Sequence, residues 1–316
     1  MALLATASFA QKQVKSNSYT LNVSSADSAA DPKTKENLTA AFLQVYPAFA
    51  QADGYRTVKN ADLTFTKDLT PTIKASAGKI VVNETWIKNK SVKAIEKTLR
   101  YALSKNWYSA DTIKKGGYQL VFISKDPALD LHVKKRLIET YFEVYPVLVK
   151  TFNRKSTREV LFVVDTAYKA VAEASNGRIL FSAAYLKAHP TDIDVVTHET
   201  MHIVQGYGYN AGPVWLTEGI ADYIRYKYGV DNVGSKWSLP AYQEKHHYTN
   251  SYRITARFFV WIEQKVKPGI IPIIDQQLRV HEYTPQSWVT LTGKTLDELW
   301  VEYAKNPEVT LTYSSK

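Results

Sequence analysis

The segment "VVTHETMHIVQ" at residues 195–205 places His198 and His202 four residues apart, with Glu199 directly after the first. The longer segment "TDIDVVTHETMHIVQ" predicts a helix that begins at Thr191, a residue type that is common at helix N-caps. Residues four apart lie on one face of a helix, so both imidazoles can approach one metal ion. Glu199 then stands beside the first ligand, where it can take a proton from water.

The surrounding sequence repeats an earlier part of the chain with an offset of 99 residues. "LTAAFLQVYPAFA" (38–50) resembles "LIETYFEVYPVLV" (137–149), and "ASAGKIVV" (75–82) resembles "ASNGRILF" (174–181). The same offset continues without a gap over about 85 residues, which indicates an internal duplication of one structural unit.

The duplication provides an internal control for the histidines. At the offset of 99, the segment Leu99-Arg100-Tyr101-Ala102-Leu103 stands where residues 198–202 stand in the second copy. The first copy therefore keeps the scaffold without the metal-binding side chains. Packing of this helix does not require histidines, which favours a chemical role for His198 and His202.

Each copy has the pattern of an α/β unit, and the C-terminal part is mainly helical. "YQLVFIS", "REVLFVVD" and "GRILFS" predict strands, and the segment from residue 130 to 152 predicts a helix. We expect an α/β (α+β) fold with a duplicated strand-helix-strand unit, its second copy completed by a helical C-terminal part. The expected boundaries are a tail or residual signal segment at 1–17, a degenerate repeat at 18–116 and a larger domain at 117–316 that contains the two histidines.

A third ligand is expected on the next helix, because catalytic zinc takes three protein ligands and leaves one position open. "WLTEGIADYIR" follows a loop rich in Gly and Pro that can reverse the chain. Its Glu218 is the predicted third ligand. Asp222, one turn further on, is the competing candidate, although a role in orienting a ligand histidine suits it better.

Four motifs together resemble one known family. "HETMHIVQ", "EGIADYIR", "YRITARFF" and "GKTLDELWVEY" occur in the order found in the basic secretory protein family, zinc peptidases of plants and bacteria. The resemblance covers roughly residues 117–305. It implies that residues 117–316 form a zincin-like metallopeptidase domain of the gluzincin type, that the protein is secreted, and that two histidines and a downstream glutamate are the zinc ligands. The loop "GYGYNAGPVW" departs from the family pattern because it lacks the family's usual Trp after the Gln.

The reaction that the resemblance implies is hydrolysis of a peptide bond with Glu199 as the general base. Such a reaction also needs a group that stabilises the oxyanion. The candidates are Tyr252, Arg257 and Tyr209, of which Tyr252 is our prediction. The alternative function is a non-catalytic zinc-containing binding protein, whose metal only stabilises the fold.

Composition limits the remaining possibilities. The 316 residues include no Cys, which excludes disulfides and a thiol nucleophile. The net charge of +10 is concentrated in residues 1–116, where 17 Lys and Arg face 9 Asp and Glu. This suggests attraction to an anionic cell-surface polymer, while no dense basic run indicates nucleic acid. No apolar run is long enough to span a membrane.

The N-terminal segment "MALLATASFAQKQ" is apolar from Ala2 to Ala10 and has small residues near its end. It resembles the rear half of a secretory signal peptide without its basic start. We therefore expect a secreted or periplasmic protein.

Overall fold

The computed structural model describes residues 12–16, 19–23, 31–52, 59–69, 72–76, 78–103 and 108–314. The chain divides into two compact units, Met1–Ser109 and Ala110–Lys316. The apolar segment from Ala2 to Ala10, expected to be part of a signal, lies outside the described residues. The first described residues, from Lys12, form a strand.

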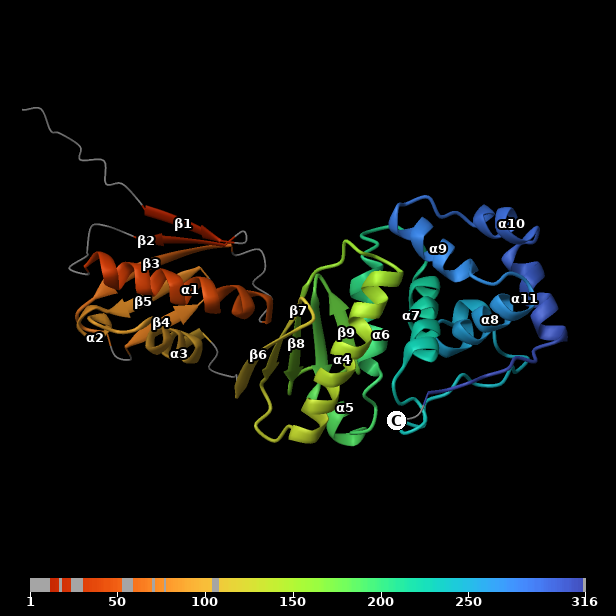
Figure 1. Cartoon of the computed structure of the whole chain (residues 1–316), viewed down its shortest axis with the longest axis horizontal. Helices are drawn as coiled ribbons and strands as arrows, with labels where there is room; N and C mark the ends of the chain where they lie inside the picture. The colour runs from red at the N-terminus through yellow and green to blue at the C-terminus, as the bar shows by residue number, and fades with distance from the viewer. Residues whose placement is uncertain are drawn as a thin grey trace, which may run out of the picture. The chain divides into compact units, whose positions relative to one another are not determined.

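The first unit contains a five-stranded sheet of order β1-β2-β3-β5-β4 and three helices in its described part (Figure 1). β2, β3 and β5 are parallel, while β1 and β4 run antiparallel at the edges. The elements are β1 (Lys12–Ser16), β2 (Tyr19–Val23), α1 (Pro32–Ala52), β3 (Asn60–Thr66), β4 (Ile73–Ser76), β5 (Lys79–Asn83), α2 (Glu84–Ile87) and α3 (Val92–Leu103).

The second unit contains a sheet of order β6-β7-β8-β10-β9, in which β7, β8 and β10 are parallel and β9 is an antiparallel edge strand. The elements around this sheet are β6 (Ser109–Lys115), β7 (Tyr118–Ser124), α4 (Leu131–Thr151), β8 (Glu159–Asp165), β9 (Ala172–Ser175), β10 (Arg178–Ser182), α5 (Ala183–Ala188) and α6 (Val195–Gln205). The helical part adds α7 (Val214–Tyr228), the 3-10 turn η1 (Tyr248–Asn250), α8 (Tyr252–Lys265), α9 (Ile270–Arg279), α10 (Gln286–Thr292) and α11 (Leu296–Lys305).

The mixed α/β architecture expected from the sequence is confirmed. The two sheets also share one strand order, and four elements of the first unit have the bounds of their counterparts in the second when shifted by 99 residues. These pairs are α1 and α4, β3 and β8, β4 and β9, and β5 and β10. β6 belongs to the second sheet, so the division between the units falls before the boundary expected after residue 116.

The helices of the second unit form successive layers on the sheet. α4 and α6 lie side by side on one face, α7 packs on α6, and α8 packs on α7 (Figure 1). Buried aliphatic and aromatic side chains fill the space between them, including Tyr141, Phe162, Ile220 and Phe259. Burial of this apolar area is the main force that holds α6 and α7 together.

The start of α6 differs from the sequence expectation. The helix begins at Val195 with Asp194 as its N-cap residue, so the prediction of Thr191 is wrong. The buried Asp194 carboxylate accepts hydrogen bonds from the Thr197 hydroxyl and from the backbone N–H groups of Val230 and Asp231. A tertiary contact with the loop after α7 therefore fixes where α6 starts.

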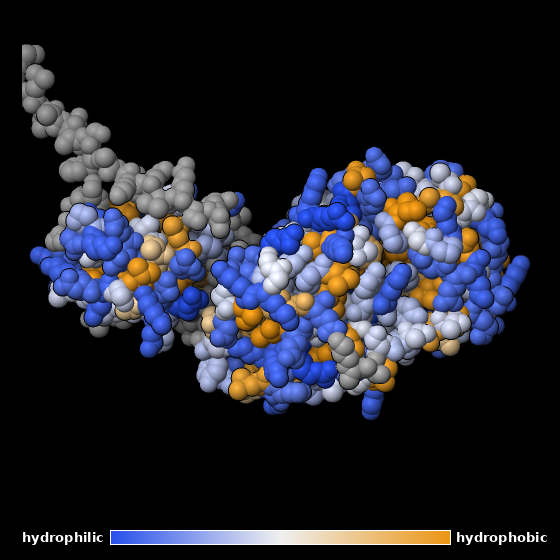
Figure 2. All heavy atoms as spheres, in the orientation of Figure 1, coloured by the Kyte–Doolittle hydropathy of each residue, from blue (hydrophilic) through white to orange (hydrophobic). Residues whose placement is uncertain are grey.

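None of the described helices has the length and apolarity needed to cross a bilayer. On the face drawn in Figure 2, hydrophilic residues predominate in the second unit and hydrophobic ones lie between them.

Candidate active site

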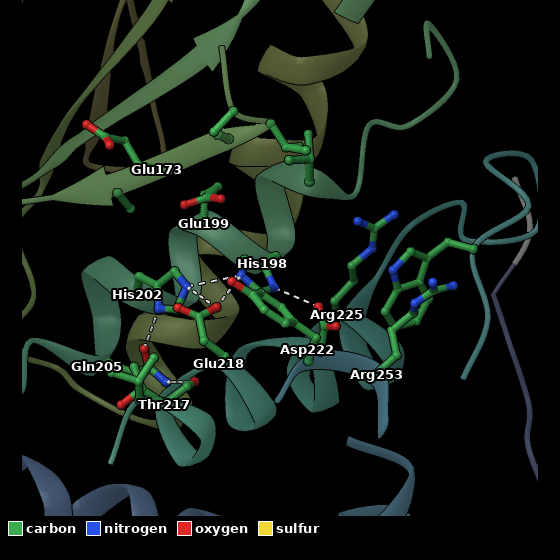
Figure 3. Close-up of a pocket in the computed structure, with 18 of the residues that line it drawn as sticks. Glu173, His198, Glu199, His202, Gln205, Thr217, Glu218, Asp222, Arg225 and Arg253 are labelled. Carbon is green, nitrogen blue, oxygen red and sulfur yellow. Dashed lines mark hydrogen bonds and ion pairs between the residues drawn. The ribbon is translucent and has the colours of Figure 1, made fainter. Parts of the chain in front are cut away.

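A cleft of about 1210 Å³ runs along α6 in the second unit. Its walls come from the edge strand β9, from α6 and α7, and from the first residues of α8. His198, Glu199, His202 and Glu218 all line it (Figure 3). The motif at 195–205 and the downstream glutamate thus face the same space.

Three side chains converge at the centre of the cleft. Nε2 of His198 and Nε2 of His202 are 3.1 Å apart. Oε2 of Glu218 lies 3.3 Å from the first nitrogen and 3.4 Å from the second. α7 supplies Glu218 because it packs on α6.

Both histidines are oriented through their other ring nitrogen. Nδ1 of His198 lies 2.7 Å from Oδ1 of Asp222, and Nδ1 of His202 lies 2.7 Å from Oε1 of Gln205. Both partners are acceptors, so each Nδ1 carries a proton, and Nε2 is the nitrogen of each ring that faces the centre of the cleft. Asp222 therefore contacts the outer nitrogen of His198, while Glu218 lies among the inner ones.

The electrostatics of this group favour a positive charge at its centre. Burial by itself lowers the pKa of His198, but the carboxylates of Asp222, Glu218 and Glu199 outweigh it and raise that pKa to about 10. Burial raises the pKa of Glu218, yet its hydrogen bonds to both histidines hold it well below its usual range. A cation between these groups would be stabilised.

Glu199 differs from the other acidic groups of the cleft because hydrogen bonds do not offset the burial of its carboxylate. Its side chain is almost fully buried, and Oε2 has no hydrogen-bond partner among the described residues. Burial raises its pKa, against the two nearby histidines that lower it. A carboxylate in this state is suited to accept a proton.

The three candidates for oxyanion stabilisation are placed differently. Tyr252 lines the cleft, with its ring stacked 6.2 Å from that of His198. Tyr209 also lines the cleft but is 93% exposed. Arg257 is buried outside the cleft lining, where its guanidinium donates to the carbonyl oxygen of Pro307.

Tyr252 stands at a strained place in the backbone. It is the first residue of α8 and has φ of 52°, and Ser251 before it has φ of 65°. Two successive non-glycine residues at positive φ cost about 1–3 kcal/mol each and often mark functional sites. Glu218 and burial together raise the pKa of the Tyr252 hydroxyl, which keeps it protonated as a donor.

The donor set fits a zinc ion. Two imidazole nitrogens and one carboxylate oxygen are the ligands of many catalytic zinc sites. Ligand atoms about 2.0–2.2 Å from a tetrahedral ion lie about 3.3 Å apart, which matches the separations among the three donors. His198, His202 and Glu218 would hold the ion.

Gln205 was not identified from the sequence, although it orients His202. It lies three residues after His202, on the same side of α6, and its Nε2 donates to the carbonyl oxygen of Thr217 on α7. The i to i+3 spacing was the available signal. Glutamine is common in helices, however, and its role depends on α7.

The fold and the site define a mixed α/β protein with a cleft that carries a His-His-Glu group and a buried glutamate. Residues 117–303 match the family described as peptidase of plants and bacteria. The chain belongs to this family, as the sequence motifs indicated. No curated protein matches the sequence significantly.

Two solved structures are similar to the chain at a low level. The aminopeptidase A of Legionella pneumophila, solved in complex with aspartic acid, has 15% identity and a TM-score of 0.41, with 62% of this chain and 28% of that chain covered. A two-domain M1 zinc metallopeptidase, solved as a mutant bound to L-tryptophan, has 15% identity and a TM-score of 0.34, with coverages of 64% and 49%. The chain thus spans less than half of the length of each.

Proposed function

We propose that the protein is a zinc-dependent metallopeptidase that hydrolyses peptide bonds, with Glu199 as the general base. The observation that carries the proposal is the convergence of three donor atoms beside a buried carboxylate, one oxygen of which has no hydrogen-bond partner in the described part of the chain. Zinc held by His198, His202 and Glu218 would polarise the peptide carbonyl as a Lewis acid. It would also lower the pKa of water, so that the water loses a proton readily and can attack the carbonyl carbon.

The protein's own side chains account for the remaining parts of the mechanism. Glu199 accepts the proton of the attacking water and donates it to the leaving amine nitrogen. Asp222 and Gln205 keep the protons of the two histidines on Nδ1, so that Nε2 stays available. The Tyr252 hydroxyl donates a hydrogen bond to the oxygen that becomes negative in the transition state.

The test compares the wild type with Glu199→Gln on a mixed peptide library, with mass spectrometry as the readout. Glu199→Gln should keep its zinc and lose about 10²–10⁴-fold in cleavage rate, which is the usual contribution of a general base. His202→Ala should lose both zinc and cleavage. Equal cleavage by the wild type and Glu199→Gln would contradict the mechanism.

The competing proposal is a binding protein in which zinc only stabilises the second unit. In that case the protein would contain stoichiometric zinc, and neither the wild type nor Glu199→Gln would cleave a peptide. A buried glutamate without a partner favours the peptidase, because a structural site gains nothing from its desolvation cost.

We also propose that the first unit is a degenerate copy of the catalytic one. The shared strand order and element bounds support this, and Leu99 and Leu103 are buried in the first unit at the positions of the two histidines. Attraction of this basic unit to an acidic polymer, and secretion or a periplasmic location, remain predictions from the sequence. Fractionation of cells that express the gene, followed by salt-dependent binding to an anionic polysaccharide, would test both.

A further inference from the structure

The cleft is electrically asymmetric along its length. Beyond Asp222, on the side of His198 away from His202, it is lined by Arg225, Lys236 and Arg253 (Figure 3 labels both arginines). Around Gln205 and the loop before α7 the lining residues are uncharged, and Glu173 of β9, which Figure 3 shows on the side away from the arginines, is paired with Arg178.

Two of the three cations at this end lack a counter-ion. Arg225 is buried and paired with Asp192, and its guanidinium lies 4.6 Å from the centre of the Trp237 ring. Lys236 and Arg253 are exposed, and neither has an acidic group within 4.0 Å in the described part of the chain. The Arg253 guanidinium donates one long hydrogen bond of 3.4 Å to the carbonyl oxygen of Ser238.

The positions of these two cations oppose local stability. Arg253 is the second residue of α8, where the helix dipole disfavours a cation by about 0.3–1 kcal/mol, and the first turn has no acidic residue to offset it. Lys236 has φ of 55°, a conformation that side chains other than Gly, Asn and Asp rarely adopt. Two residues that lower local stability at the same end of a cleft indicate that this end has a function.

The distance to the reaction centre suits a peptide substrate. Arg225 follows Glu218 by seven residues on α7, a rise of about 10 Å. An extended peptide advances about 3.3 Å per residue. This end of the cleft therefore lies about three substrate residues from the bond to be cleaved.

We propose that Arg253 and Lys236 bind a carboxylate of the peptide substrate within about three residues of the scissile bond. This inference rests on the proposed peptidase function and names the substrate class of the same cleft. The carboxylate comes either from an Asp or Glu side chain or from the C-terminus of the peptide, since both present the same two oxygens to a guanidinium.

The experiment uses the full-length protein with zinc and a peptide that the wild type cleaves. Glu, Gln or Lys is placed at each of three positions on either side of the cleaved bond, with a free or amidated C-terminus. At one position the wild type should prefer Glu to Gln by about tenfold or more in kcat/KM, as expected for a charge-assisted hydrogen bond. A preference for the free C-terminus alone would assign the carboxylate to the chain end, and a preference that persists in amidated peptides would assign it to a side chain.

The variants are Arg253→Gln, Lys236→Gln and the double variant, with Lys305→Gln on the exposed face of α11 as the matched control. The ratio of kcat/KM for Glu and Gln peptides should fall toward one in the double variant and stay unchanged in the control. Equal cleavage of Glu and Gln peptides by the wild type at every position, or a preference that survives the double variant, would overturn the proposal.

A binding measurement separates this inference from the proposed function. Calorimetric titration of the chelator-treated protein with peptides that differ only in Glu or Gln at one position needs no reaction, and the peptides need not be ones that the protein cleaves. Tighter binding of the Glu peptide that depends on Arg253 and Lys236, without cleavage of any peptide, would support the carboxylate site and contradict the peptidase. Cleavage without any preference for acidic peptides would support the peptidase and contradict the carboxylate site. If neither cleavage nor tighter binding of the Glu peptide is seen, both proposals are overturned.

Discussion

At the scale of single residues, the two histidines of α6 depend on different partners. Asp222 holds His198 with a charged acceptor, whereas Gln205 holds His202 with a neutral amide. Gln205 is itself fixed at both ends, because its side chain donates to Thr217 and its carbonyl oxygen accepts from Arg279. The two partners should therefore contribute unequally to metal affinity.

The first prediction concerns Asp222. Asp222→Ala should weaken zinc binding by about 10–100-fold, because the His198 ring loses the group that fixes its tautomer and orientation. Asp222→Asn keeps an acceptor for Nδ1 of His198, so its zinc affinity should lie between those of the wild type and Asp222→Ala. Competition with a chromophoric chelator measures this, with Glu139→Gln on the exposed side of α4 as control. Unchanged affinity in Asp222→Ala would refute the orienting role.

The second prediction concerns Gln205. Gln205→Ala should lower zinc affinity by about tenfold, at the lower end of effects seen for groups that orient metal ligands. Gln205→Glu restores an acceptor for Nδ1 of His202 and should recover most of the affinity. The same chelator competition measures the zinc affinity of both variants. Equal losses of affinity in Gln205→Ala and Gln205→Glu would indicate a packing defect instead of a lost hydrogen bond.

At the scale of elements, the position of Glu218 depends on how closely α7 and α8 pack. Gly219 follows Glu218, and a Cβ on it would lie 2.4 Å from Cγ2 and 2.8 Å from Cβ of Thr255 on α8. Phe259 is also within 3.1 Å of that point. The absence of a side chain at Gly219 is therefore what lets α7 carry Glu218 at its present depth.

The third prediction follows from this contact. Gly219→Ala should lower the free energy of unfolding by about 1–3 kcal/mol, the usual range for overpacking, and should weaken zinc binding by moving Glu218. Urea denaturation measures the first effect. The added substitution Thr255→Ser removes Cγ2 and keeps the hydroxyl that donates to Tyr248, so the double variant should recover part of the loss. Additive effects would show that the two residues do not clash.

At the scale of the whole molecule, each unit has a hydrophobic core of its own. The first is built around Phe42, Tyr46 and Leu99, and the second around residues such as Tyr145 and Phe258. Among the described residues, the group of possible metal ligands belongs to the second unit. Metal should therefore act on the stability of one unit.

The fourth prediction is a calorimetric one. Scanning calorimetry of the full chain should show two transitions, and zinc at about 1,000 times its dissociation constant should stabilise one of them by about 4 kcal/mol. Calorimetry of the fragment 110–316 alone identifies which transition belongs to the second unit. His202→Ala should abolish the zinc-induced shift of that transition. A zinc-induced shift of the other transition would contradict the degenerate nature of the first unit.

The sequence by itself determined the spacing of the two histidines and the mixed α/β pattern of the chain. The spacing of His198 and His202 places both on one helix face, and helical periodicity is a local property that a single segment carries. The family motifs extended this to a peptidase. The repeated segments likewise carried the strand and helix pattern of both units, because that pattern depends on the order of apolar residues.

Only the tertiary structure decided which groups reach which atoms. Glu218 lies among the Nε2 atoms and Asp222 reaches Nδ1 because α7 packs on α6 at a depth set by Gly219 and Thr255. The start of α6 and the role of Gln205 likewise depend on contacts with other elements. Arg253 and Lys236 reach one end of the cleft from separate parts of the chain. Contacts between distant segments follow from side-chain packing, for which no local pattern in the sequence exists.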